Sequence, residues 1–497
     1  MKNKQIYAHL QNNIDVIEQC FERSSDAVRR RFYVGKNRYP VYTAYMDSMI
    51  NRDFVEGELI KGLMFQTGEL PTENTLMYIK DCCMPTADVK VITALDQAVT
   101  EILSGNTVLF GENAPMALMI NSKGFPNRGV SEAESEVAIR GPKDSFTESV
   151  RFNTVLIRRR IRDFRLKAEG LKIGVRSKTD VAVMYMDDLV RPEVLEAILR
   201  RLQSFEIDGV LDSGMLEQMT EKKWYSPFPQ FQSTERPDKA ASALMEGRVA
   251  VIVDNSPMVL LLPATLACFF QASDDYYNRW GIVCFTRLLR YAAAVIAMTL
   301  PGLYIAVANF HPEIFPTSLA LSFTASRQGV PFPLAIEVIL MELAFEVLRE
   351  AGIRLPGPMG STLGIVGGLI IGQAAVDANI VSPVVVIVVA LTALAAFTIP
   401  NEGFASAFRL VKFFLIFTGA FFGILGFVMG GIVVMIHLCS LTSFGIPYML
   451  PFVDSSVCPK EDYKDSALRF PLFAMKDRPI FTRENARVRL KRKKGGQ

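Results

Sequence analysis

The side chains with the clearest chemical potential in this chain are carboxylates in apolar surroundings. Asp377 follows Gln373 by four residues in a stretch otherwise almost free of charge, and Glu342 and Glu346 share that spacing in an earlier apolar stretch. Residues four apart lie on the same face of a helix. An ionisable residue inside an apolar helix of bilayer length often marks a path for ions. We therefore predict that Gln373, Asp377, Glu342 and Glu346 contribute to an ion path.

Each of these candidates also has a plainer interpretation. Asp377 lies near the end of its apolar stretch, where a carboxylate can reach water. Glu342 and Glu346 share one helix face with Arg349, whereas Glu337 lies opposite. Several carboxylates facing lipid would be costly. This second helix is therefore expected to be interfacial, re-entrant or in contact with water.

A stripe of glycines precedes Asp377. Gly360, Gly364, Gly368 and Gly372 recur every four residues and would form one flat face of a helix. Small residues in such a stripe let two helix backbones approach closely within a membrane. We predict that this face packs against a neighbouring helix or against a second copy of the chain.

Other kinds of chemistry have little support in the sequence. The 7 cysteines show no Cys-x-x-Cys spacing, and the 3 histidines are far apart. We find no phosphate-binding loop, nucleophile elbow or dinucleotide fingerprint. We therefore expect no metal, no cofactor and no enzymatic activity.

The chain divides sharply into a charged front half and an apolar back half. A membrane-crossing helix needs roughly 20 apolar residues, and stretches of about that length occur at 288–310, 361–381, 384–400 and 411–438. The N-terminus has no signal-peptide pattern. Basic residues near the first span and in the tail place both ends in the cytoplasm and require an even number of crossings. Against this, Arg409 and Lys412 would then fall on the outer side.

The front half contains an internal repeat. Gly105 and Gly247 begin similar segments at an offset of 142 residues, each followed by Asn-x-Pro-Met. A second match begins at Ala44 and Met184, at an offset of 140. Two matches in the same order indicate a duplication.

The second copy carries readable local signals. Val181–Met186 is typical of a strand, Pro192–Gln203 of an amphipathic helix, and 207–211 of a returning strand. Ala240–Glu246 should be a helix that ends at a glycine. The apolar stretch 249–270 is long enough to suggest a membrane segment, but its internal turn and the charged Asp254 predict a buried hairpin instead.

Between the copies lies a basic run, from Arg158 to Arg162. It could contact anionic lipid headgroups, or form a solvated helix face. No nucleic-acid-binding module accompanies it, so nucleic acid is not an expected partner.

The predicted fold class is a soluble α/β region of two duplicated subdomains followed by an all-α transmembrane domain. The expected boundaries are 1–145 for the first α/β subdomain and 146–280 for the second. The transmembrane domain would occupy 281–452, with about four to five spans. A basic cytoplasmic tail would follow at 453–497.

Several motifs resemble the A subunits of bacterial spore germinant receptors, the GerA type. They include Tyr225-Ser-Pro-Phe-Pro-Gln230, Gly247-Arg-Val-Ala-Val-Ile-Val-Asp254, Gly372-Gln-Ala-Ala-Val376 and Ser443-Phe-Gly-x-Pro-Tyr448. The resemblance covers roughly residues 130–455 and is looser elsewhere. A paralogous group, the stage V sporulation protein AF, shares these motifs, and the sequence does not separate the two.

This resemblance implies a multi-pass protein of the spore inner membrane, in contact with its lipids. It also implies a multi-span B subunit and a lipoprotein C subunit as partners, and homo-oligomerisation into a ring that releases ions when a nutrient is sensed. Two alternatives are a non-conducting scaffold of the receptor cluster and a secondary transporter. The transporter would require inverted repeats among the membrane helices, whereas the repeat found lies in the front half.

Overall fold

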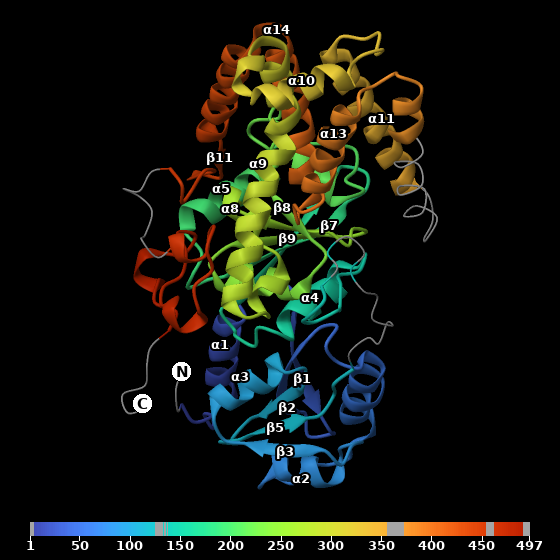
Figure 1. Ribbon diagram of the computed structural model, residues 1–497. Coiled ribbons are helices and arrows are strands. Elements are labelled where there is room, and N and C mark those ends of the chain that lie inside the picture. Colours follow the sequence, from blue (N-terminus) through green and yellow to red (C-terminus); the bar gives the residue numbers. More distant parts are fainter. Residues whose placement is uncertain are drawn as a thin grey trace. The chain divides into compact units, whose positions relative to one another are not determined.

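The computed structural model of the chain describes residues 4–124, 133, 136, 138–354, 372–453 and 462–490 (Figure 1). The chain forms two compact units. Unit 1 comprises Met1–Lys222, Phe231–Pro263 and Lys476–Gln497, and unit 2 comprises Lys223–Gln230 and Ala264–Met475. The contacts therefore separate the two units at Pro263, ahead of the expected boundary at 280. The C-terminal segment from Lys476 onward also belongs to unit 1.

The first α/β subdomain of unit 1 is a five-stranded antiparallel sheet with the strand order β1-β2-β4-β5-β3. Its elements are α1 (Leu10–Cys20), β1 (Ala27–Val34), β2 (Tyr39–Met46), η1 (Asp53–Ile60), η2 (Gly62–Gln66), α2 (Thr75–Cys82), β3 (Val89–Ile92), α3 (Leu95–Leu103), β4 (Thr107–Gly111) and β5 (Ala117–Ile120). Helices cover both faces because successive residues of a strand point to opposite sides. Tyr42, Ala44 and Met46 pack on the side of α1 and α3, whereas Val41 and Tyr45 pack on the side of α2.

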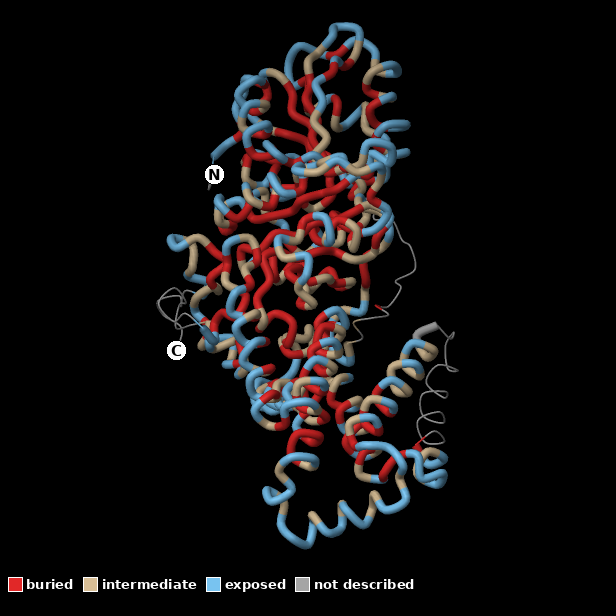
Figure 2. Tube along the Cα trace, turned by 90° about the horizontal axis from the view of Figure 1, so that it is seen from above, coloured by how far each residue is buried: buried red, intermediate tan, exposed pale blue. Residues whose placement is uncertain are grey.

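The second subdomain repeats this topology with the strand order β6-β7-β9-β10-β8. Its elements are α4 (Val150–Arg158), β6 (Leu166–Ile173), β7 (Thr179–Met186), α5 (Pro192–Leu202), α6 (Ser213–Thr220), β8 (Gln232–Thr234), α7 (Pro237–Met245), β9 (Val249–Val253) and β10 (Val259–Leu262). Every residue of the central strands β4 and β9 is buried, and in Figure 2 the buried segments run through the interior of the trace.

The duplication is confirmed down to single residues. Gly105 and Gly247 both have a φ near +85°, at +86° and +85°, directly before the matching strands β4 and β9. Asn13 exchanges hydrogen bonds with the backbone of Tyr7, and Asn153 does the same with Thr147. The predicted α/β front half with two related subdomains is therefore correct.

Most local predictions for the second copy are confirmed. The stretch 249–262 is the hairpin β9–β10, with Leu260 paired to Val251, and every residue of both strands is buried. The predicted strand at 207–211 is wrong, because the position beside β10 is taken by β8. The backbone carbonyls of Ile207 and Asp208 instead accept hydrogen bonds from the β6–β7 turn.

Unit 2 is mainly helical. Its elements are α8 (Leu266–Phe270), η3 (Ser273–Tyr276), α9 (Trp280–Phe310), η4 (Pro312–Ile314), α10 (Thr317–Ser326), α11 (Leu334–Arg354), α13 (Pro383–Ala396), α14 (Glu402–Ser440), the short strands β11 (Thr442–Ser443) and β12 (Ile446–Pro447), η5 (Asp462–Lys464) and η6 (Leu472–Ala474); η7 (Glu484–Ala486) belongs to unit 1. Within the described ranges, α9 and α14 are the helices long and apolar enough to cross a membrane, and α13 is a shorter apolar helix.

Helix α14 is a hairpin rather than one rod. Gly423 has a φ of 61° and a ψ of −147°, which breaks the helix, and this backbone region is essentially restricted to glycine. The second limb folds back along the first, since a Cβ at Gly430 would lie 2.8 Å from the hydroxyl of Thr418. The predicted single span at 411–438 is therefore two limbs, of roughly 30 and 25 Å at 1.5 Å per residue.

Helices α13 and α11 also pack against α9. The start of α13 contacts the second half of α9 through Val385 and Ile305, and its end contacts the first half through Ala395 and Ala293, so the two helices are antiparallel. Helix α11 is continuous and packs on α9, α13 and α14. Much of the predicted span 361–381 lies outside the described residues.

Candidate functional site

Two of the predicted ion-path carboxylates lie in a buried charge cluster between α11 and α14. The Nζ atom of Lys412 lies 2.5 Å from Oε2 of Glu342 and 3.4 Å from Oε1 of Glu346. Arg409 Nη1 lies 3.3 Å from the other oxygen of Glu346. Glu342 is 2% exposed and Lys412 is 6% exposed. We call these four side chains the α11–α14 charge cluster.

The cluster places Arg409 and Lys412 in a role that the sequence did not indicate. The expected topology puts both charges on the outer side, whereas in the structure each donates to a carboxylate on α11. The pairing leaves one buried acceptor unused, because Oε1 of Glu342 has no hydrogen-bond partner among the residues that the structure describes.

Glu337 has a separate task at the start of α13. Its Oε2 atom accepts a hydrogen bond of 2.9 Å from the backbone N–H of Ser382, and Oε1 lies 3.3 Å from Arg327. A carboxylate is favourable at this end of a helix because the first N–H groups are unpaired and the helix dipole is positive there. Glu337 is therefore apart from Glu342 and Glu346, as the helical wheel predicted.

The second predicted pair is joined but exposed. Gln373 Nε2 donates to Asp377 Oδ1 at 3.3 Å, and both side chains lie at the surface of unit 2. Of the predicted glycine stripe, Gly372 is described: it is buried, and a Cβ there would lie 3.3 Å from Val386 on α13. Gly360, Gly364 and Gly368 lie outside the described residues.

A different glycine pair brings α9 and α14 together. A Cβ at Gly419 would lie 2.7 Å from the carbonyl oxygen of Gly302, and one at Gly302 would lie 2.8 Å from that of Leu415. The backbones approach so closely that only glycine fits at either position. This contact is hard to predict, because Gly302 has no glycine one turn away on α9 and its partner Gly419 is remote in sequence.

The proline-rich segment 223–230 belongs to unit 2 although it lies between α6 and β8 in the chain. Phe228 is 1% exposed and packs against Phe404 and Phe408 of the first α14 limb. Ser226 lies 2.9 Å from Nε2 of His437 on the second limb. The segment thus contacts both limbs near their shared end and helps to hold them together.

The basic run beginning at Arg158 has a structural role instead of a lipid-facing one. Arg158 is 1% exposed and makes a bidentate ion pair with Asp26 of the first subdomain, one contact measuring 2.7 Å. Arg160 pairs with Asp144 at 2.6 Å. The prediction of a solvated or lipid-binding face is therefore wrong for these two arginines, because their charges are used within unit 1.

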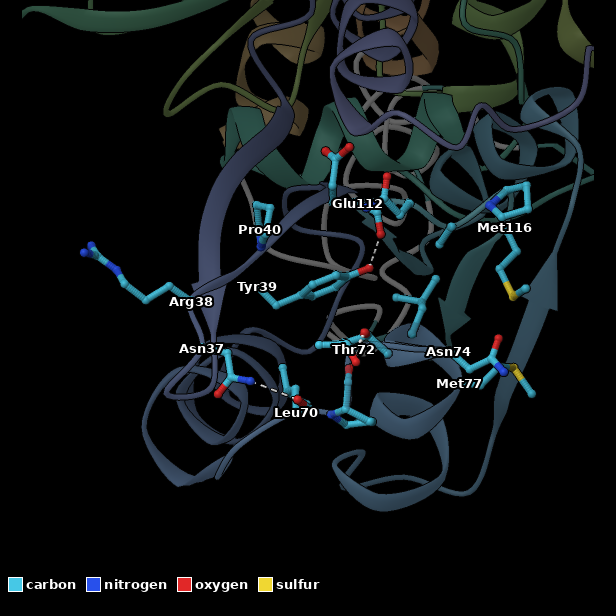
Figure 3. A pocket seen from close by; sticks show the side chains of 16 residues that line it. Asn37, Arg38, Tyr39, Pro40, Leu70, Thr72, Asn74, Met77, Glu112 and Met116 are labelled. Carbon is cyan, nitrogen blue, oxygen red and sulfur yellow. Dashed lines mark hydrogen bonds between the residues drawn. The ribbon is translucent and has the colours of Figure 1, made fainter.

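The first subdomain contains a cavity of about 340 Å³ (Figure 3). It lies between the β1–β2 turn, the start of α2 and the β4–β5 turn, which contribute 37–40, 70–72 with 74–77, and 112–116. Tyr39 crosses it and donates to the carbonyl of Glu112 at 2.5 Å. Burial, together with the Glu112 carboxylate, raises the pKa of Tyr39 to about 12, so the phenol keeps its proton at neutral pH. No motif in the sequence indicates this cavity.

Metal-binding geometry is not found in the part of the chain that the structure describes: no group of three or more His, Cys, Asp or Glu side chains is arranged to hold an ion. Most of the carboxylates in apolar surroundings are instead paired with arginine or lysine.

Comparisons with known proteins agree with the sequence motifs. Residues 15–481 match the family described as Bacillus/Clostridium GerA spore germination protein. The chain is 38% identical over 495 residues to the uncharacterized membrane protein YfkQ of Bacillus subtilis, covering 99% of this chain and 95% of that protein. It is also 38% identical over 482 residues to the spore germination protein KA of B. subtilis, covering 97% and 88%.

A solved structure is also similar. The N-terminal domain of the A subunit of the Bacillus megaterium spore germinant receptor GerK3 aligns at 28% identity and a TM-score of 0.42, covering 53% of this chain and 98% of that one. The family match extends over most of the chain and through both units. The chain therefore belongs to the GerA family of spore germination proteins.

Proposed function

We propose that this chain is the A subunit of a spore germinant receptor, and that it triggers germination by releasing ions through an oligomeric channel in the spore inner membrane. Family membership supports a role in spore germination, since relatives along the whole chain are named spore germination proteins. The channel mechanism rests on the helical unit, and chiefly on one observation, the α11–α14 charge cluster.

The cluster supports a gated path because its two carboxylates and two cations balance in charge while one buried acceptor stays without a hydrogen bond. Glu342 gives one oxygen to Lys412, and its other buried oxygen has no partner among the described residues. A buried carboxylate oxygen without a donor costs free energy. A partly dehydrated cation would satisfy it. In this proposal Lys412 occupies the path in the resting state and moves aside when the path opens.

The other predicted residues take complementary roles in the proposal. Gln373 and Asp377 present oxygens at the surface of unit 2 and would meet ions where the path widens. The stripe of Gly360, Gly364, Gly368 and Gly372 would form the contact between copies of the chain, since a ring requires a tightly packed helix face.

Connectivity supports an even number of membrane crossings. The chain leaves unit 1 after Pro263 and returns to it at Lys476. If unit 1 stays on one side of the bilayer, both ends of the intervening helices must face that side. This agrees with a cytoplasmic N-terminal region and C-terminal tail.

Receptor partners follow from family membership, and we propose a multi-span B subunit and a lipoprotein C subunit. The segment 223–230 offers a way for such partners to act on the helices, because it contacts both limbs of α14 and is joined along the chain to α6 and β8. A state change in the α/β region could then shift the free-energy balance between closed and open helices.

The decisive experiment measures cation efflux from spores that carry Glu342→Gln, with germinant added and protein levels matched. If Glu342 contributes to the path, the substitution alters the rate of efflux or the preference among monovalent cations. The matched control is Glu313→Gln, whose carboxylate is exposed beyond the end of α9. Efflux with unchanged rate and selectivity in Glu342→Gln would remove this residue from the path.

A second measurement separates a channel from a scaffold. The purified chain, alone and with its B and C subunits, is reconstituted in a planar bilayer. Germinant-dependent conductance supports the channel, and its absence in every combination supports the non-conducting scaffold.

A further inference from the structure

The internal duplication provides a comparison for the cavity of the first subdomain, because the second subdomain has the same three elements around the equivalent space. Tyr39 and Thr179 each begin the second strand of their sheet, and Asn74 and Asp212 each precede the equivalent helices α2 and α6. Ala114 and Ser256 follow Asn113 and Asn255, which both have positive φ in the hairpin turn.

In the second subdomain this space is filled by the chain's own polar side chains. Asp212 accepts a hydrogen bond of 2.8 Å from the N–H of Gly214 in the first turn of α6. Its other carboxylate oxygen accepts from Ser256 at 2.6 Å. Thr179 donates to the carbonyl of Val210 at 2.7 Å. Ser256, Val210 and Thr179 are at most 6% exposed, so the inner side of this space is closed, while Asp212 covers it from the surface.

In the first subdomain the same bridge is missing. The residue at the position of Ser256 is Ala114, which has no hydroxyl, and Asn74 replaces Asp212 and makes no capping hydrogen bond. Leu76 corresponds to Gly214 and is 2% exposed, yet its N–H has no acceptor among the residues that the structure describes. What remains is the cavity of about 340 Å³, at the small end of the range for ligand pockets.

We propose that this cavity binds a small organic carboxylate, whose carboxylate group takes the place that Asp212 holds in the second subdomain. The amide of Asn74 and the N–H of Leu76 would donate to it, at a helix end that favours negative charge. Met77 and Met116 provide an apolar surface for the rest of the molecule (Figure 3), and Pro115 also lines the cavity.

The charged side chains at the cavity are compatible with an anion. Glu112 is already engaged, because its carboxylate lies 2.7 Å from His9 and accepts from the N–H of Leu10 at the start of α1. Asp254 caps α4 in the same way in the second copy. Arg38 is at the rim and points away from the cavity in Figure 3. The proposal is independent of the channel mechanism.

The test uses the full chain in detergent and three probes: butyrate, butyramide and inorganic phosphate. Ligand-observed NMR should detect butyrate binding, with butyramide at least about tenfold weaker, because the neutral amide lacks the charge. Hydrogen exchange in the presence of butyrate should slow at the start of α2 and not at the start of α6. Absence of butyrate binding, or equal binding of butyramide, would overturn the proposal; binding of phosphate alone would overturn the carboxylate assignment.

A substitution pair gives the test its specificity. Asn74→Asp with Ala114→Ser copies the second subdomain's own bridge into the first, so butyrate binding should be lost while the thermal midpoint is kept or raised. The control is Asp81→Asn at the opposite end of α2, which should bind butyrate like the unmodified chain. Undiminished binding in the double variant would place the butyrate elsewhere and refute the site.

Discussion

The α11–α14 charge cluster allows a quantitative prediction through the substitution Lys412→Met. Methionine keeps much of the length of the lysine side chain but removes its positive charge. Glu342 then loses the donor at 2.5 Å, and Glu346 loses its second donor while retaining Arg409. Glu342 is 2% exposed, so water cannot replace the lost contact without a local rearrangement.

The size of the effect follows from burial. At an effective dielectric constant of about 20, unit charges at this separation attract each other by roughly 7 kcal/mol before desolvation is subtracted. Removing one partner of a buried pair typically costs about 3–5 kcal/mol, because an uncompensated charge remains. We expect Lys412→Met to lower the free energy of unfolding by that amount. The double variant Lys412→Met with Glu342→Gln should recover at least about 1 kcal/mol, since it also removes the unpaired charge.

The assay is denaturant-induced unfolding in a fixed detergent, followed by circular dichroism for the unmodified chain, both single variants and the double variant. Arg279→Met serves as the control, because Arg279 is exposed at the start of α9 and should change stability by less than about 0.5 kcal/mol. If Lys412→Met is as mild as Arg279→Met, or if the double variant is no more stable than Lys412→Met, the cluster is not a coupled buried pair and the reasoning fails.

Three further predictions concern other contacts. Gly419→Ala should destabilise unit 2 by about 1–3 kcal/mol, because its Cβ would lie 2.7 Å from the carbonyl oxygen of Gly302. The control Gly431→Ala places its Cβ in open space and should be neutral or slightly stabilising. Thermal unfolding in detergent compares the two variants. Asp26→Asn should destabilise unit 1 by about 3 kcal/mol, because it leaves Arg158 buried without its counter-charge. Hydrogen exchange should increase at β6, and unchanged exchange there would contradict the prediction. Burial, with Glu221 and Asp212 nearby, raises the pKa of Glu217 to about 7, so the folded state holds this proton more tightly than the unfolded state. The contribution of Glu217 to stability therefore decreases as pH rises from about 4.5 to 7, by up to about 3 kcal/mol. Glu217→Gln should remove that part of the pH dependence of the free energy of unfolding, and identical pH profiles for the two proteins would refute it.

Much of unit 1 could be predicted from sequence because its signals are local and are repeated. The strand at 181–186, the helix at 192–203 and the hairpin at 249–262 have clear periodicity or turn signals, and the first copy shows the same pattern. The strand predicted at 207–211 failed because the carbonyls of Ile207 and Asp208 accept hydrogen bonds from the β6–β7 turn, while β8 pairs with β10. The cavity could not be predicted, since it results from the absence of a bridge between residues far apart in sequence.

The candidate site was predictable only in part. Carboxylates within apolar stretches are visible in a sequence, and the structure places Glu342 and Glu346 side by side. Their partners were missed because Lys412 is 70 residues from Glu342 along the chain. The fold of α14 was missed for a related reason: an apolar stretch of that length is compatible with one tilted span or with two limbs, and the conformation of Gly423 determines which one forms.

The sequence alone determined the division of the chain into a charged and an apolar part, the duplication within the first part, and the family. These properties depend on composition, periodicity and residue identity, which are present before the chain folds. The tertiary structure decided which charges neutralise each other, where α14 reverses, which glycines allow α9 and α14 to touch, and which of the two subdomains keeps an open cavity. Each of these depends on distances between residues remote in sequence, and those distances are set only when the helices and sheets pack.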